Sequence, residues 1–261
     1  MKEAIDSEKN NGVLVPKGLL VAVGGNEDKE HDLYVLRKIV SLVKARIVNI
    51  EIITTASEIP GEMEKMYRRS FNRTGNTSVR FMHIKTREQA EDKQYIQRIK
   101  KCHVVFFTGG DQLRLSSILG GTLFLDAIIN KYYTEECIVA GTSAGAAAMS
   151  QTMIFGGESA EALLKGSVNV TAGMGLVQNV IIDSHFIKRG RFSRLMELIT
   201  SSPGHIGIGL GEDTGIIIRK GYLVEATGNG LVVIFDGKRI KYSNISSIET
   251  GEAISVENMH V

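Results

Sequence analysis

Short apolar runs alternate with segments of helical periodicity through the first half of this sequence. The apolar runs predict strands at 19–23, 47–54, 79–84 and 104–107, and the periodic segments predict helices at 32–44, 60–74 and 87–101. Parallel strands need long crossover connections, which are usually helices. The alternation therefore predicts an α/β fold of three layers, with a mainly parallel sheet and helices on both of its faces.

The last part of the chain has a different pattern. From Thr214 onward, short apolar runs meet at glycine-containing turns, at 219–222 and 228–230. This pattern predicts a β-rich C-terminal extension that continues the sheet in the antiparallel sense. We find no linker, repeat or low-complexity block, and 43% of the 261 residues are hydrophobic. We therefore expect a single domain over 1–261, with a loosely ordered N-terminal segment at 1–16.

A serine lies between two glycines where an apolar run gives way to small residues. The sequence Gly141-Thr142-Ser143-Ala144-Gly145 follows the run 137–140, and 144–150 is predicted to be a helix. Glycines and small neighbours allow the sharp strand-to-helix turn called a nucleophile elbow, which exposes the serine hydroxyl. Ser143 is therefore the candidate nucleophile, and the N–H of Ala144 is a candidate oxyanion donor.

A serine hydroxyl needs a base to remove its proton and an acid to orient that base. Among the six histidines, His185 stands out because it follows the apolar run 180–182 at a predicted strand end. Ligands of open α/β sheets bind at the carboxyl ends of strands. Glu212 and Asp213 follow the apolar run 206–210 in the same way, and this pattern leaves both open as the acid. We expect Ser143, His185 and the acid to meet at a common edge of the sheet.

A second glycine pair follows the predicted strand 104–107, in Gly109-Gly110-Asp111-Gln112. Glycine allows close approach of the backbone to a ligand, so we expect the N–H of Gly110 to be the second oxyanion donor. The pair Gly24-Gly25 follows the first strand. It has neither the dinucleotide fingerprint nor the lysine spacing of a phosphate-binding loop, so no nucleotide cofactor is predicted.

Four cations follow Asp183 closely: Lys188, Arg189, Arg191 and Arg194. The planar arginine fork suits carboxylates, so the cluster favours a substrate with carboxylates along a chain. An alternative is a helix with basic residues on its solvent face. Binding to nucleic acid is not predicted, because 31 Lys and Arg nearly balance 29 Asp and Glu and no series of stacking aromatic residues is present.

The order Ser, His, acid on a parallel sheet is similar to that of serine peptidases with the class I glutamine-amidotransferase-like fold. Over nearly its whole length the chain resembles the cyanophycinases, within the serine peptidase family that also includes the aspartyl dipeptidases. The specific motifs are the elbow around Ser143 and the Asp-x-His-Phe segment at 183–186 with its trailing arginines. The weaker ones are Gly24–Lys29, Thr54–Ser57, Thr108–Gln112 and Gly209–Thr214.

The resemblance implies a catalytic set of Ser143, His185 and Glu212, with Glu212 preferred over Asp213. It implies hydrolysis of cyanophycin, a poly-aspartate with arginine on each side-chain carboxyl, to β-aspartyl-arginine dipeptides through an acyl-enzyme. It implies a homodimer without a cofactor or metal. The implied substrate-binding residues are Gln112, Asp183, Ser184, Arg189, Arg191 and Arg194. Ser184 departs from the family pattern, which has glutamine there, so its shorter side chain alters that contact.

Three other hypotheses remain open. The first is a dipeptidase or isopeptidase for short acidic peptides on the same fold. The second is a metal-dependent hydrolase with Asp183 and His185 as ligands, and the third is a binding protein without activity.

Cys102 and Cys137 both lie beside apolar runs, which predicts buried, reduced thiols. We find no secretion signal and no apolar run of membrane-spanning length, so we expect a cytoplasmic protein that does not bind membranes.

Overall fold

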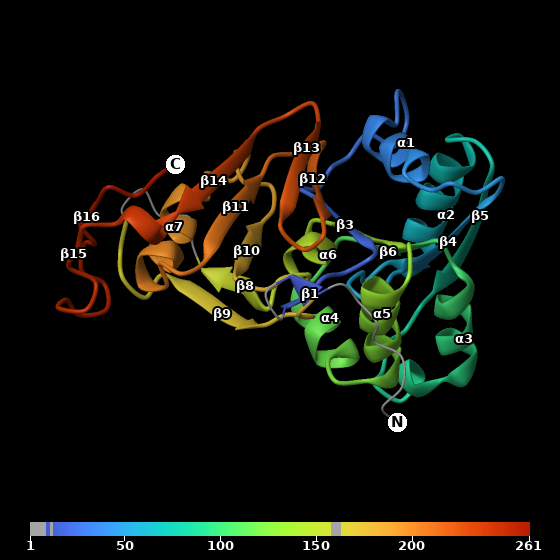
Figure 1. Ribbon diagram of the computed structural model, residues 1–261, viewed down its shortest axis with the longest axis horizontal. Helices are drawn as coiled ribbons and strands as arrows, with labels where there is room; N and C mark the ends of the chain where they lie inside the picture. The colour runs from blue at the N-terminus through green and yellow to red at the C-terminus, as the bar shows by residue number, and fades with distance from the viewer. Residues whose placement is uncertain (1–8, 11–12, 158–162) are drawn as a thin grey trace.

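A seven-stranded sheet forms the centre of the computed structural model, which describes residues 9–10, 13–157 and 163–261 (Figure 1). The strands run in the order β13-β12-β3-β7-β6-β4-β5. Their bounds are β3 (Leu19–Val23), β4 (Val48–Ile53), β5 (Thr77–Met82), β6 (Val104–Phe107), β7 (Ile138–Thr142), β12 (Thr214–Arg219) and β13 (Leu223–Gly228). The five strands from β3 to β5 are parallel, while β12 pairs antiparallel with β3 and β13 with β12. Both the mainly parallel sheet and its antiparallel continuation were predicted correctly.

Helices cover both faces of this sheet. One face carries α1 (Tyr34–Ser41) and α2 (Pro60–Asn72), and the other carries α3 (Lys93–Lys101), α4 (Gln112–Leu119), α5 (Leu123–Thr134) and α6 (Ala144–Ala147) (Figure 1). Successive side chains of a strand point to opposite faces. Val104 and Phe106 of β6 accordingly pack with α1 and α2, whereas Val105 and Phe107 pack with the other layer. The expected three-layer α/β fold is confirmed.

A second, smaller sheet lies beside the first and contains β10 (Val180–Asp183), β11 (Ile206–Leu210) and β14 (Val232–Asp236). The pair β10 and β11 is parallel, and β14 is antiparallel to β11. Helix α7 (Phe192–Ser201) packs on this sheet with a core of its own. It can do so because β11 carries glycines: a Cβ at Gly207 would lie 2.9 Å from Leu195, and one at Gly209 would lie 2.4 Å from Phe186.

The second sheet corrects one expectation. We expected the strand ends before Ser143, His185 and Glu212 to share a single sheet edge. The strand before Ser143 belongs to the central sheet, whereas those before His185 and Glu212 belong to the second sheet. The candidate site therefore lies where the two sheets meet.

The predicted helices were too long: the one at 60–74 by two residues, since α2 ends at Asn72, and three others by more. The first spans only Tyr34–Ser41, because Leu33 before it has a left-handed φ of 54°. The predicted helix at 87–101 is divided into a 3₁₀ turn, η1 (Gln89–Glu91), and α3. Asp92 separates the two because its backbone is extended and its side chain caps α3 at the N–H of Gln94. The helix after Ser143 ends at Ala147 instead of position 150.

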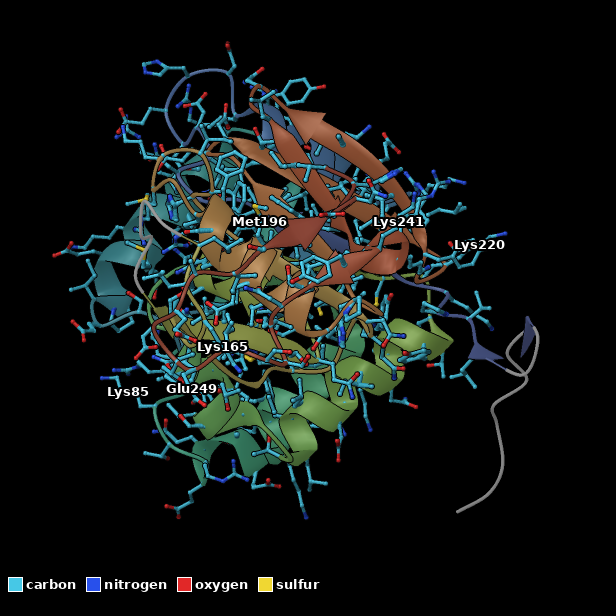
Figure 2. All side chains as sticks on the ribbon, turned by 90° about the vertical axis from the view of Figure 1, so that its left-hand side faces the viewer. Lys85, Lys165, Met196, Lys220, Lys241 and Glu249 are labelled. Atoms are coloured by element: carbon cyan, nitrogen blue, oxygen red, sulfur yellow. The ribbon has the colours of Figure 1, made fainter. Side chains whose placement is uncertain are left out.

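The remaining elements lie outside these two sheets. They are β1 (Lys9–Asn10), β2 (Val13–Leu14), β8 (Thr152–Gly157), β9 (Val168–Ala172), η2 (Gly237–Arg239), β15 (Tyr242–Ser243) and β16 (Val256–Glu257). Strands β1 and β2 form a hairpin within the segment expected to be loosely ordered, and the rest of that prediction lies largely outside the described residues, which exclude 1–8 and 11–12. Lys165 donates a hydrogen bond to the carbonyl of Ile248 in the C-terminal part of the chain, and it lies close to Glu249 in Figure 2.

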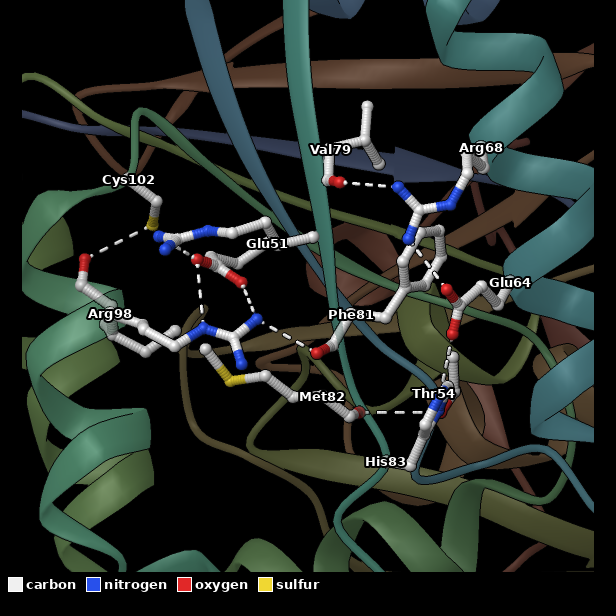
Figure 3. A network of polar contacts seen from close by, with 12 residues as sticks. Glu51, Thr54, Glu64, Arg68, Val79, Phe81, Met82, His83, Arg98 and Cys102 are labelled. Carbon is white, nitrogen blue, oxygen red and sulfur yellow. Dashed lines mark hydrogen bonds and ion pairs between the residues drawn. The ribbon is translucent and has the colours of Figure 1, made fainter.

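Polar side-chain networks connect β4 and β5, at one edge of the central sheet, to helices α2 and α3 (Figure 3). The carboxylate of Glu51 in β4 is fully buried and forms ion pairs with Arg98 of α3 and Arg80 of β5. His83 follows β5 and uses both ring nitrogens, one with Thr54 at 2.7 Å and one with Glu64 of α2 at 2.9 Å. These contacts give His83 a structural role.

Cys102 and Cys137 are both buried and free, as predicted. Among the described residues, no single helix has the length and apolar character needed to cross a membrane. Helices α4 and α5 meet that test only as a pair, with a bend of 99° between them.

Candidate active site

Ser143 lies on a strained turn between β7 and α6. Its φ of 52° and ψ of −111° are rare for a residue with a side chain. The flanking glycines are required by packing. A Cβ at Gly141 would lie 2.6 Å from the carbonyl of Gly145, and a Cβ at Gly145 would lie 2.5 Å from the carbonyl oxygen of Phe107. The Gly-x-Ser-x-Gly pattern therefore forms the predicted elbow for a steric reason.

The structure brings Ser143, His185 and Glu212 into one hydrogen-bonded line. The Oγ atom of Ser143 lies 2.9 Å from Nε2 of His185, and Nδ1 of the same ring lies 2.8 Å from Oε1 of Glu212. The side chains of His185 and Glu212 are 14% and 28% exposed, so the line is partly shielded but open to solvent. This arrangement has the geometry of a nucleophile, a general base and an orienting acid.

Glu212 contacts the imidazole and Asp213 does not, although the sequence pattern left both open. The carboxylate of Asp213 accepts hydrogen bonds from the N–H of Asp28 at 2.9 Å and from Asn229 at 2.7 Å. Glu212 also accepts a bond from Asn26 at 3.2 Å through its second oxygen. The hydrogen bonds from His185 and Asn26 hold the pKa of Glu212 below its usual value of 4.5, against the opposing effect of burial.

The segment after β3 holds the three parts of the site together through its backbone. The carbonyl of Val23 accepts from the N–H of Ser143 at 2.9 Å, that of Gly24 from His185 at 2.7 Å, and that of Gly25 from Asp213 at 3.0 Å. The glycine pair was visible in the sequence, but neither this role nor the role of Asn26 was predicted. A glycine pair and a polar residue at the end of a central strand were the only available signal.

The predicted oxyanion donors lie next to the nucleophile. Ala144 is the first residue of α6, where an N–H has no acceptor within its own helix. Gly110 has a φ of 142°, and a Cβ there would lie 2.1 Å from the carbonyl oxygen of Ala56. The preceding Gly109 packs against Ser143, since its own Cβ would lie 3.4 Å from the serine Cβ. Glycine is thus required at 110, and the loop contacts the elbow.

Three of the six predicted substrate-binding residues bond to one another. Asp183 is 2% exposed, and both of its carboxylate oxygens accept from Arg194, while Arg191 donates to one of them at 3.0 Å. Arg191 also donates to the backbone oxygen of Ser184 at 2.6 Å, and burial lowers the pKa of Arg191 to about 10. These groups form a buried ion cluster below His185, which leaves them little freedom to bind a ligand.

The other predicted binding residues differ in exposure. Ser184 is 5% exposed, so it lies largely under the surface. Arg189 and its neighbour Lys188 are exposed beside the site. The amide of Gln112 donates to the carbonyl of Ile154 at 3.0 Å, which fixes one end of that side chain. Of the cations predicted for carboxylate recognition, Arg189 and Lys188 are the ones presented to solvent.

The contacts of Asp183 and His185 bear on the metal hypothesis. Both nitrogens of His185 are engaged by Ser143 and Glu212, and the carboxylate of Asp183 is engaged by Arg191 and Arg194. Among the residues that the structure describes, no group of three or more His, Cys, Asp or Glu side chains could hold a metal ion. The donors named by the hypothesis are committed to other partners.

Comparison with models of known protein families assigns the chain to one family. The model of Peptidase family S51 matches residues 19–225, which include Ser143, His185 and Glu212. The chain belongs to Peptidase family S51. Its relatives include the cyanophycinase of Trichormus variabilis, 35% identical over 245 residues, which cover 94% of this chain and 82% of that protein. The cyanophycinase of Geminocystis herdmanii is 34% identical over 242 residues, which cover 93% of this chain and 89% of that protein.

The fold is also similar to that of solved structures at lower sequence identity. The crystal structure of a peptidase from an acI-B1 Actinobacterium has a TM-score of 0.70 and 23% identity, covering 87% of this chain and 93% of that one. A putative Peptidase E protein from Listeria monocytogenes has a TM-score of 0.54 and 14% identity, covering 82% and 99%. At these sequence identities, the two matches show that the fold is shared.

Proposed function

We propose that this chain is a serine peptidase of the cyanophycinase type, which hydrolyses cyanophycin to β-aspartyl-arginine dipeptides. The observation that carries the proposal is the continuous line from Ser143 Oγ through His185 to Glu212, at 2.9 and 2.8 Å. Membership of Peptidase family S51 and the cyanophycinase relatives support the same reaction and substrate.

In the proposed mechanism, His185 removes the hydroxyl proton of Ser143 as the oxygen attacks an aspartyl peptide carbonyl. Glu212 stabilises the imidazolium that forms and keeps its Nε2 directed at the serine. The N–H groups of Gly110 and Ala144 stabilise the oxyanion. The imidazolium then protonates the leaving amine, and an acyl-enzyme forms. Water, deprotonated by His185, releases the acyl group in the second half of the reaction.

Substrate recognition in this proposal combines direct contacts with a buried support. We assign direct contact with the substrate to Arg189, to Gln112 and to Lys188, which like Arg189 is exposed. Asp183, Arg191 and Arg194 hold the segment that carries His185 and Ser184, so their part in binding is mainly indirect. The exposed cations attract substrate carboxylates.

The central experiment incubates purified protein with insoluble cyanophycin and identifies the released products. We expect β-aspartyl-arginine from the wild type and none from Ser143→Ala with an intact fold, as checked by circular dichroism. A serine-directed fluorophosphonate should label the wild type at Ser143, and chelator should leave activity unchanged. An active Ser143→Ala variant would exclude the mechanism.

The same assay separates the other hypotheses. Release from short aspartyl peptides but none from the polymer would favour a dipeptidase or isopeptidase of the same fold. Loss of activity with chelator would favour the metal-dependent hydrolase, and absence of both turnover and labelling would favour a binding protein.

We also propose that the enzyme works in the cytoplasm as a homodimer, without a cofactor and without binding nucleic acid or membranes. Light scattering during size-exclusion chromatography should give twice the mass of 28.5 kDa. A monomer mass would exclude the dimer.

A further inference from the structure

Glu27 is a buried carboxylate that the proposed reaction does not use. It is 2% exposed and directly follows Asn26, which contacts Glu212. Its Oε2 atom accepts a hydrogen bond from the hydroxyl of Thr142 at 2.6 Å, and its Oε1 atom accepts one from Tyr67 at 2.5 Å. The ammonium group of Lys29 lies 3.2 Å from Oε1. A buried carboxylate is costly unless such partners surround it.

In both hydrogen bonds Glu27 is the acceptor and a hydroxyl group is the donor. Burial and the neighbouring Glu27 raise the pKa of Tyr67 well above its usual value, so the phenol stays protonated. Its hydroxyl therefore donates a hydrogen bond to the carboxylate. Thr142 can likewise donate its hydroxyl proton to Oε2. Both hydrogen bonds are charge-assisted in a buried environment, where they are stronger than in water. Glu27 is therefore a rigid acceptor between α2 and the end of β7.

The position of Thr142 gives this contact a consequence for the site. Thr142 is the last residue of β7 and is joined by one peptide bond to Ser143, whose φ is 52°. The helix after the serine, α6, packs in the layer opposite α2. Glu27 thus holds the elbow from the face of the sheet that α6 does not cover. A strained backbone persists only where surrounding contacts enforce it.

We propose that Glu27 is a positioning residue, which through the hydroxyl of Thr142 keeps Ser143 in the backbone conformation that directs Oγ at His185. This inference rests on the proposed role of Ser143 as nucleophile. The competing explanation is that Glu27 serves only to attach α2 to the sheet. The two explanations differ in what loss of the Thr142 hydroxyl does to the reactivity of Ser143.

The test compares Thr142→Val, which keeps the branched shape and removes the hydroxyl, with Thr142→Ser, which keeps the hydroxyl. We expect Thr142→Val to lower kcat about 10- to 100-fold with KM nearly unchanged, because a small misplacement of a reacting atom has effects of this size. Fluorophosphonate labelling of Ser143 should slow by the same factor. Thr142→Ser should stay within about threefold of the wild type on both measures.

Tyr67→Phe is the matched control, since it removes the other buried hydroxyl from the same carboxylate without touching the elbow. It should lower the thermal midpoint but keep kcat. Glu27→Met, which keeps the side-chain length but removes the oxygen acceptor, provides a second route if Thr142→Val folds poorly, and it should reproduce the slow labelling. Wild-type kcat and labelling in Thr142→Val would overturn the proposal, as would equal losses of kcat in Thr142→Val and Tyr67→Phe.

The outcome is separable from that of the proposed function. If fluorophosphonate fails to label wild-type Ser143, or Ser143→Ala stays active, the nucleophile assignment fails and the positioning role fails with it. If the wild type is labelled, Ser143→Ala is inactive and Thr142→Val is normal, only the positioning role fails.

Discussion

The imidazole of His185 lies against the backbone of Gly25, so closely that a Cβ at position 25 would lie 2.4 Å from both Cε1 and Nε2 of the ring. Gly25 also has a φ of 97°, a conformation that side chains disfavour. We expect Gly25→Ala to displace the ring and to lower kcat about 100-fold or more. Gly75→Ala is the matched control, because φ is 128° there and its Cβ would meet nothing within 4 Å. Both variants should lose stability in urea unfolding, and equal kcat values would contradict the prediction.

Replacing Glu212 and replacing its neighbour Asp213 should have different effects on kcat. Glu212→Gln removes the charge that orients His185, and we expect kcat to fall about 10³- to 10⁴-fold, as for the corresponding change in other Ser-His-Asp enzymes. Asp213→Asn should keep kcat within a few-fold, since Asp213 contacts Asp28 and Asn229 instead of the ring. Steady-state assays of both variants decide this, and a larger loss in Asp213→Asn would reverse the assignment.

The lowered pKa of Glu212 has a consequence for stability at acid pH. A carboxyl whose folded-state pKa lies below its unfolded value of 4.5 stabilises the fold above that value, and this stabilisation is lost as the pH falls through the folded-state pKa. Glu212→Gln lacks the titrating group. The difference in free energy of unfolding between the wild type and this variant should therefore change in favour of the variant as the pH falls below 4.5. Urea unfolding at several pH values measures it, and a difference independent of pH would contradict the prediction.

The buried ion cluster and the exposed arginine should respond differently to truncation. Asp183→Ala leaves the buried Arg194 and the partly buried Arg191 without their partner, and we expect a loss of about 3–5 kcal/mol in unfolding free energy. Arg189→Ala should change stability by less than about 0.5 kcal/mol, because its side chain is exposed. If Arg189 contacts substrate as proposed, its replacement should raise KM. An unchanged KM would remove Arg189 from the recognition site.

The cysteines should be inert in the folded enzyme. Burial raises the pKa of both Cys102 and Cys137 to about 12, so the reactive thiolate is scarce at neutral pH. Iodoacetamide should leave activity unchanged and label both thiols only after unfolding, as mass spectrometry would detect. Rapid labelling of the native protein with loss of activity would contradict this.

Several features of the site were predictable because they are local. The elbow needs small residues within two positions of Ser143, and glycine at 141 and 145 is written directly in the sequence. His185 and Glu212 each follow an apolar run, which places them at strand ends. The choice between Glu212 and Asp213 was not local. Neighbours along the chain cannot indicate which carboxylate turns toward a ring that lies 27 positions away from Glu212 in the sequence.

The sequence by itself determined the order of strands and helices, the three-layer α/β class and the serine elbow, because period and turn chemistry act over a few residues. Only the tertiary structure decided that His185 and Glu212 come from a second sheet, that Asp183 and two arginines bond to one another, and that residues 23–26 contact the segments of the site. Those outcomes depend on packing and charge pairing between segments far apart in the chain, which no local pattern encodes.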